Sequence, residues 1–135
     1  MWSLAGLRVL RFGNPLVRLV LESRAHRLLS GRLLLLSYRG HRSGREYRIP
    51  LRYAETPDRR FVALALRPDG KAWWRSFTAP AHATLTVRGS RIRVSGELAT
   101  RAGREEALDA YLARYRRSAH VAHGAAVVVF TAAGG

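Results

Sequence analysis

The densest group of side chains suited to chemistry lies in residues 40–45, which read Gly-His-Arg-Ser-Gly-Arg. The two glycines permit a tight bend whose backbone amides can point toward an anion, and Ser43 adds a hydroxyl group. The guanidinium groups of Arg42 and Arg45 match the paired oxygens of a phosphate. The segment therefore has the composition of a phosphate-binding turn. A solvated hairpin loop has the same local spacing, and the segment lacks the glycine signatures of nucleoside-triphosphate loops and dinucleotide folds.

A second group places cations beside adjacent indoles, in Lys71, Trp73, Trp74 and Arg75. Two consecutive tryptophans on a helix point in different directions. We therefore expect one of them to enter the core and the other to line a groove with Lys71 or Arg75, where planar rings can stack. Burial of both tryptophans is the alternative.

Metal and nucleophile chemistry has little support in the sequence. There are no cysteines, which excludes disulfides, thiolate metal sites and a cysteine nucleophile. The five histidines do not show the spacing of a helical zinc site, and residues 40–45 do not match the nucleophile turn of serine hydrolases. Adjacent Glu105 and Glu106 do not project together as a glycosidase pair would. We expect no metal site.

Net charge is the most unusual bulk property. The chain has 24 Lys and Arg residues against 9 Asp and Glu, a formal net charge of +15, and Lys71 is its one lysine. Nucleic acid, acidic lipid and a phosphorylated cofactor would each satisfy this charge. With 135 residues, 47% of them hydrophobic, the chain has the length of one domain. No apolar run approaches the ~20 residues of a membrane span. We expect a soluble, cytoplasmic protein.

Apolar periodicity predicts the elements that position these groups. Asn14 and Pro15 indicate the start of a helix that ends near Leu29, and a shorter basic amphipathic segment precedes it. Helical turns are expected at 72–77, and a further helix after Thr100. Six strands are expected at 33–38, 47–53, 61–66, 83–87, 92–94 and 126–130. Pro50 indicates an edge strand or a bulge. Because helices and strands do not alternate, we expect an α+β, mainly β fold without a parallel sheet.

The order and spacing of these residues resemble the deazaflavin-dependent nitroreductase family. The resemblance extends from residue 14 to residue 130 and is carried by the leucine run 33–36, Gly40, Arg42, Ser43, Gly44, Pro50, Leu51, Lys71, Trp73, Trp74, Arg75 and the hairpin at 84–94. It implies a single domain over residues 1–135, a six-stranded antiparallel split β-barrel related to flavin-binding barrels. In that fold residues 1–31 form a helical segment packed on the barrel of residues 32–131, and one helix precedes the last strand.

The same resemblance implies a cofactor and a reaction. The cofactor is coenzyme F420, a deazaflavin with a phosphate and a glutamate tail, and its reduced form would give a hydride to a quinone, a nitro compound or another small electrophile. The residues that correspond to the family's phosphate and tail contacts are His41, Arg42, Ser43, Gly44, Tyr47, Arg48 and Pro50. Those that would border the ring are Leu64, Ala65, Leu66, Arg67, Lys71, Trp73 and Trp74.

The sequence departs from the family at three places. Tyr47 stands where the family has an arginine, so Arg45 or Arg48 would take that role through a shift of register. Leu66 replaces a small polar residue, and no tyrosine follows Tyr115 to cover a substrate. Because the cofactor supplies the hydride, a protein acid is optional and no catalytic residue is assigned. The candidates for such an acid are Tyr47, Tyr115 and His120.

Other functions stay open beside this one. The chain could be an FMN-binding protein of the same fold, or a cofactor carrier without turnover. It could also be a basic protein at the inner face of an acidic membrane, held there by its N-terminal segments. Nucleic acid is not expected, because no groove-reading element is apparent. The expected partners are an anionic redox cofactor, a small electron acceptor and, by analogy with related barrels, a second copy of the chain.

Overall fold

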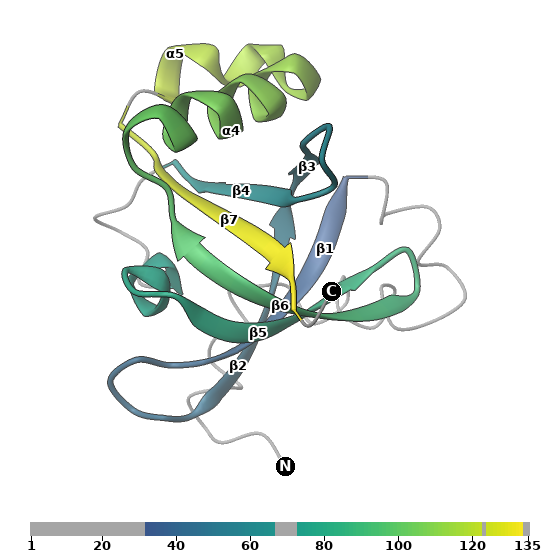
Figure 1. Cartoon of the computed structure of the whole chain (residues 1–135), viewed down its shortest axis with the longest axis vertical. Coiled ribbons are helices and arrows are strands. Elements are labelled where there is room, and N and C mark those ends of the chain that lie inside the picture. Colours follow the sequence, from purple (N-terminus) through teal and green to yellow (C-terminus); the bar gives the residue numbers. More distant parts are fainter. Residues whose placement is uncertain (1–31, 67–72, 123, 134–135) are drawn as a thin grey trace. The chain divides into compact units, whose positions relative to one another are not determined.

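The computed structural model describes residues 32–66, 73–122 and 124–133 (Figure 1). These residues form two compact units, and strand β6 (Ser90–Leu98) runs from the first into the second. The first unit contains residues 32–52 and 82–94, and the second contains residues 53–66, 73–81, 95–122 and 124–133. The helices expected within residues 1–31 lie outside the described part of the chain. The single domain expected over residues 1–135 stays a prediction.

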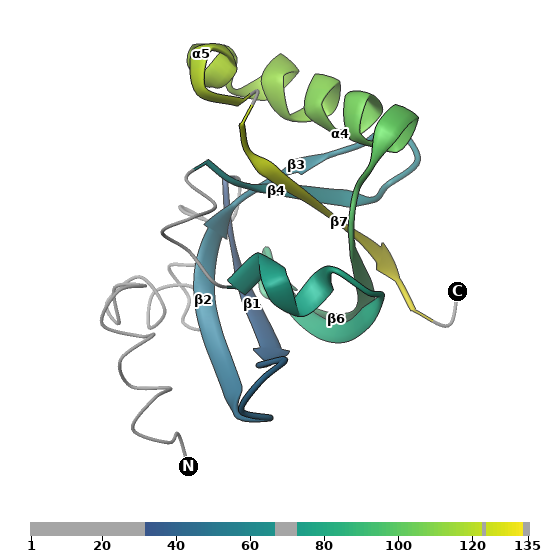
Figure 2. The same cartoon turned by 90° about the vertical axis from the view of Figure 1, so that its left-hand side faces the viewer.

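The first unit is built on an antiparallel ribbon of β1 (Leu33–Arg39) and β2 (Glu46–Arg52), with β5 (Ala81–Val87) on the other side of β1. Figure 2 shows β1 and β2 as a long pair. The strand order in this unit is β2-β1-β5-β6, so β2 is an outer strand. Pro50 lacks an amide proton and lies within β2, which confirms the edge position expected from the sequence.

The hairpin between β5 and β6 turns through Arg88 and Gly89, which both have positive φ, 48° and 81°. Two consecutive residues with positive φ form the tight turn that matches the twist of the flanking strands. The hairpin predicted for this part of the sequence is therefore confirmed. Glycine adopts such φ values without strain. For the arginine at position 88, positive φ is unfavourable.

The second unit places α4 (Arg101–Arg114) against the strands β3 (Ala54–Glu55), β4 (Phe61–Ala65) and β7 (Ala126–Ala132), as Figure 2 shows. Strand β4 pairs with β7 from Phe61↔Phe130 to Ala65↔Ala126, and all five of its residues are buried. The core side chains of α4 are at the helical spacing expected from the sequence: Ala107, Tyr111 and, just after the helix, Tyr115. Thr100 is the N-cap residue, although its hydroxyl makes no capping hydrogen bond.

The expected number of strands was wrong. The described residues form seven strands rather than six. The sequence did not predict β3, because this strand pairs with β4 over only two residues, too few to show an alternating pattern.

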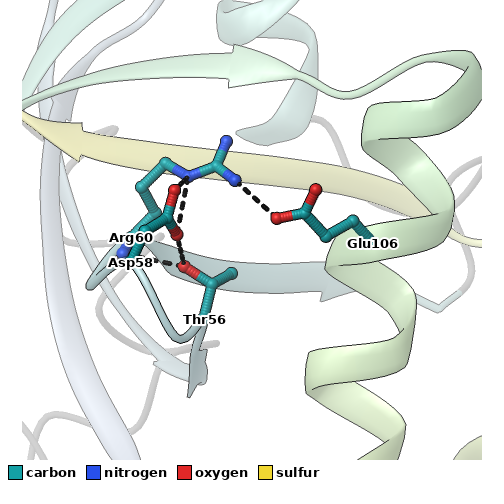
Figure 3. A network of polar contacts seen from close by, with 4 residues as sticks. All are labelled: Thr56, Asp58, Arg60 and Glu106. Atoms are coloured by element: carbon teal, nitrogen blue, oxygen red, sulfur yellow. Dashed lines mark hydrogen bonds and ion pairs between the residues drawn. The ribbon is translucent and has the colours of Figure 1, made fainter.

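The turn from β3 to β4 is held by Thr56, Asp58 and Arg60, and Arg60 also contacts Glu106 of α4 at 3.0 Å (Figure 3). The helix expected before the last strand is α4, and the short segments η3 (Arg116–Ser118) and α5 (Ala119–Ala122) follow it before β7.

Candidate functional site

The turn between β1 and β2 is closed by its own backbone. The amide of Gly40 donates to the carbonyl of Arg45 at 2.7 Å, and the amide of Gly44 donates back to the carbonyl of Gly40 at 3.0 Å. Gly44 has φ +70°, which favours glycine at this position. The guanidinium of Arg39 donates to the carbonyl of Gly44 at 2.6 Å. The bend is therefore held by its own hydrogen bonds.

The hydroxyl of Ser43 is engaged in the same turn. Its Oγ accepts the amide of Arg45 at 3.1 Å and lies 3.2 Å from the hydroxyl oxygen of Tyr47. The amides of Gly44 and Arg45 are thus used inside the turn, and the expectation that the backbone presents successive amides to an anion does not hold for these two. Anion contacts here would come from side chains, and His41, Arg42, Ser43 and Arg45 are all exposed.

Tyr47 packs against the backbone of this turn. Its ring stacks on Tyr38, its cross-strand partner, with 5.5 Å between centroids and 28° between planes. A Cβ at Gly40 would lie 2.7 Å from Cε2 of Tyr47, so only glycine permits this approach. Burial raises the pKa of the Tyr38 phenol, and the nearby Tyr47 raises it further. Tyr47 therefore packs the turn against β2.

Arg48 lies on the opposite face of β2 from Tyr47. Tyr47 is opposite Tyr38 and Arg48 is opposite Ser37 on β1, and consecutive strand residues point to opposite faces. The side chains of Tyr47 and Arg48 therefore do not share a face of β2, whereas Arg45 belongs to the exposed turn. Pro50 shares the face of Arg48 and is opposite Leu35.

The other predicted site residues lie in the second unit. Leu64 and Ala65 are buried in β4, and Leu66 is half-buried beside the core under α4. In η2 (Trp73–Phe77), Trp73 is buried and meets the ring of Phe77 edge-on at 6.4 Å. Trp74 is half-exposed, and the guanidinium carbon of Arg75 lies 5.2 Å from the centre of its ring. One tryptophan in the core and one paired with Arg75 is the division expected from the sequence. Arg67 and Lys71 lie outside the described residues.

The other two candidate acids, Tyr115 and His120, lie in the second unit. The hydroxyl of Tyr115 is buried and donates to the carbonyl of Tyr53 at 2.5 Å, which is a structural role. His120 is exposed in α5.

Residues 32–66, 73–122 and 124–133 contain no cluster of three His, Cys, Asp or Glu side chains that could hold a metal ion. Within the same residues, no helix is long and apolar enough to cross a membrane.

Positive charge is concentrated in the first unit. Its described residues contain nine arginines and one acidic residue, Glu46, a net charge of +8. The described residues of the second unit contain eight arginines and six acidic residues, a net charge of +2. The sequence did not predict the hydrogen bond from Arg39, in the same unit, to the carbonyl of Gly44. The unit that carries the turn is thus the one with the stronger attraction for anions.

Comparison with solved structures identifies the fold. An F420-H2 dependent reductase, FDR-A, matches with a TM-score of 0.64 over 74% of this chain and 94% of that chain, at 15% identity. The chain has the fold of that reductase. A protein described as a domain-swapped dimer matches with a TM-score of 0.66 over 90% of this chain and 98% of that one, at 14% identity. A FAD-binding protein from Mesorhizobium loti matches with a TM-score of 0.50 over 80% and 84%, at 17% identity.

No family model and no curated protein matches the sequence. The fold shared with the F420-H2 dependent reductase agrees with the resemblance drawn from the sequence motifs. Identities of 14–17% establish the fold and leave the activity to be argued from the site.

Proposed function

We propose that the protein is an oxidoreductase that binds coenzyme F420 and transfers a hydride from its reduced form to a small electrophile such as a quinone or a nitro compound. The observation that carries the proposal is the preformed turn of residues 40–45. Its backbone bonds hold the bend, and Arg42 and Arg45 are exposed beside the hydroxyls of Ser43 and Tyr47. Guanidinium and hydroxyl donors suit the phosphate and carboxylates of the cofactor.

In this proposal the turn binds the anionic part of the cofactor. Arg42 and Arg45 pair with its phosphate and carboxylates, and Ser43 and Tyr47 contribute one hydroxyl proton, because their two hydroxyls share a single hydrogen bond. The net charge of +8 on this unit attracts the glutamate tail from a distance. The contacts of Arg48, Pro50, Leu64, Ala65, Leu66, Trp73 and Trp74 with the cofactor stay predictions from the sequence, as do those of Arg67 and Lys71.

The bound cofactor supplies the hydride, and the protein binds it, orients it and excludes water. No side chain is assigned a catalytic role.

A homodimer is part of the proposal, and the domain-swapped dimer among the similar structures supports it. A cytoplasmic location is also part of the proposal, and the lack of cysteines agrees with it.

Cofactor titration tests the proposal. The ligands are F420, its riboflavin-like fragment without phosphate or tail, FMN and haem, and binding is followed by fluorescence or absorbance. We expect F420 to bind more tightly than the fragment, and Arg42→Gln to weaken F420 binding about tenfold while binding of the fragment is unchanged. Arg116→Gln, an exposed charge change in η3, is the matched control.

Two results would replace the proposed function. Tight FMN binding with none to F420 would indicate a flavin protein, an alternative that the FAD-binding structure also favours. Saturable F420 binding without oxidation of the reduced cofactor by any quinone or nitro compound would indicate a carrier.

A further inference from the structure

A row of polar side chains crosses one face of the sheet in the first unit. Consecutive strand residues point to opposite faces, and paired residues on neighbouring strands share a face. The registers of β1 with β2 and with β5 therefore place Arg48, Ser37 and Thr84 side by side on one face. The next row, which contains the stacked rings of Tyr47 and Tyr38, belongs to the opposite face.

Strand β6 extends this row by one residue. β5 ends at Val87 and β6 begins at Ser90, so the two-residue turn between them pairs these two residues. Counting back along β5 and forward along β6 then pairs Thr84 with Arg93. Across β2, β1, β5 and β6, which is the strand order of the sheet, the row consists of Arg48, Ser37, Thr84 and Arg93. We call it the hydroxyl row.

The face that carries the hydroxyl row is cationic. Glu46, opposite Arg39 at the end of β1, is the one acidic residue on it among the described residues of the first unit. An exposed face commonly has charges of both signs interspersed. The arginines that share this face are Arg39, Arg48, Arg52, Arg91 and Arg93. The composition of the face therefore favours an anionic ligand over a cationic or an apolar one.

The two hydroxyl groups lie at the centre of the row. Ser37 follows the leucine run 33–36 in β1, a strand with neighbours on both sides, and Thr84 is opposite Ser37 on β5. Both side chains are half-buried. Serine is not among the residues that are enriched in strands, and positions that depart from local preference are often functional. Ser37 is therefore a candidate for a role beyond the folding of β1.

We propose that the hydroxyl row binds a small oxyanion, a phosphate or a carboxylate group, over Ser37 and Thr84. Neighbouring strands are about 4.8 Å apart, and an extended arginine side chain is longer than that spacing. Arg48 and Arg93, each one strand away from the nearer hydroxyl, can therefore reach the same anion from opposite sides. Guanidinium and hydroxyl donors are the groups that recognise such oxyanions.

The contacts that Arg48 makes within its own chain are compatible with this role. A guanidinium has five N–H donors in a planar fork, so it can bond to its own chain and to an anion at the same time. Arg48 is half-buried and Arg93 is exposed, so the site is partly shielded on the side of β2 and open on the side of β6.

The hydroxyl row is distinct from the 40–45 turn, because Tyr47, which packs against that turn, points to the opposite face of β2. A free phosphate-bearing metabolite and the glutamate tail of a bound cofactor both offer the required oxyanion. The inference itself does not need the proposed function, since binding of inorganic phosphate can be measured without any cofactor.

Titration of the full chain with inorganic phosphate, without cofactor and at constant ionic strength in chloride, tests the inference. Binding is measured by calorimetry and by the rise in unfolding temperature. We expect saturable binding that Arg93→Gln weakens about tenfold and Thr84→Val about fivefold. Valine has nearly the shape of threonine and suits a strand, so Thr84→Val is expected to keep the fold, which thermal unfolding without phosphate checks.

Two variants outside the row are the controls. Arg117→Gln removes the same charge from the exposed η3 segment, and Arg42→Gln removes it from the 40–45 turn. Equal weakening by Arg93→Gln and Arg117→Gln would reduce the effect to net charge and overturn the site. Weakening by Arg42→Gln alone would assign the phosphate to the turn, with the same consequence.

Two further results would also overturn the site. One is the absence of saturable phosphate binding. The other is a Thr84→Val variant that is less stable but binds phosphate as the parent does, because the hydroxyls would then serve only a cross-strand hydrogen bond.

Titration with F420 and with F420 that keeps its phosphate but lacks the glutamate tail identifies the source of the oxyanion. Weaker binding of the complete cofactor alone to Arg93→Gln and Thr84→Val would assign the row to the tail. Undiminished phosphate binding in the presence of saturating F420 would assign it to a free phosphate-bearing metabolite. Both results support the site, and phosphate binding without any F420 binding would reject the proposed function alone.

Discussion

The hydroxyl of Tyr115 donates a hydrogen bond of 2.5 Å to the backbone carbonyl of Tyr53, 62 residues earlier in the chain. The bond is buried, and it joins the residue after α4 to the residue before β3. The guanidinium carbon of Arg114 lies 5.9 Å from the ring of Tyr53 and 5.8 Å from that of Tyr115. The helix is thereby fixed to the strands it covers.

Replacing Tyr115 by phenylalanine should leave that buried carbonyl without its donor. We expect Tyr115→Phe to lower the free energy of unfolding by about 1–3 kcal/mol. Urea unfolding followed by tryptophan fluorescence measures the change. Tyr47→Phe removes a hydroxyl from a half-buried side chain and should cost less, and equal losses in the two variants would contradict the role given to Tyr115.

Gly96 lies in close contact with two rings of the second unit. A Cβ there would be 2.7 Å from Phe77 and 2.8 Å from Phe130, whose rings pack edge to face at 5.4 Å. Gly96→Ala should therefore destabilise the protein by about 1–3 kcal/mol. Gly103→Ala is the matched control, because a Cβ there meets nothing within 4 Å and the helix α4 should gain about 0.5–1 kcal/mol. Thermal or urea unfolding of both variants checks the opposite signs.

The carboxylate of Asp58 contributes a pH-dependent stabilisation. Hydrogen bonds from the Thr56 hydroxyl and then from Arg60 lower the pKa of this carboxyl (Figure 3). A group with a lower pKa in the folded state stabilises the fold above its unfolded pKa, about 3.9 for Asp, and this stabilisation is lost as the pH falls through the folded pKa. We expect Asp58→Asn to be less stable than the parent at pH 7 and to lose less stability below about pH 4.

Denaturant unfolding over a pH series measures this effect. Asp109→Asn, an exposed charge change in α4, is the control and should keep the acid slope of the parent. An unchanged slope in Asp58→Asn would show that the Thr56 and Arg60 bonds are not maintained in solution.

Ser43→Ala removes the acceptor for the amide of Arg45 and the partner of the Tyr47 hydroxyl. We expect F420 binding to weaken about fivefold, since one neutral donor and some order of the turn are lost. Ser43→Thr keeps the hydroxyl and should retain most of the affinity. Isothermal titration of both variants checks this, and equal weakening in the two would assign the effect to steric disturbance.

Much of the fold could be predicted from periodicity and turn residues. The apolar runs before Gly40 and after Arg60, and the alternation before Arg88 and Gly89, predicted strands that the structure contains. Strand β3 escaped because a two-residue strand exists only through its pairing with β4. Its position depends on the Thr56–Arg60 turn rather than on a hydrophobic pattern of its own.

The candidate site was harder to predict than the fold. Composition singled out the 40–45 turn, but the use of the Gly44 and Arg45 amides inside it depends on backbone geometry. The opposite faces of Tyr47 and Arg48 follow from strand alternation once the register is known. Register was the missing information, because a shift by one residue exchanges the two faces.

Pro50 in β2 has a consequence for how the protein behaves when concentrated. An outer strand with free backbone groups invites strands of other molecules to add to it, and proline together with charged side chains discourages that growth. Strand β3, the outer strand of the second unit, offers only two residues for such addition. Growth of ordered fibres by addition of strands is therefore disfavoured at the outer strands of both units.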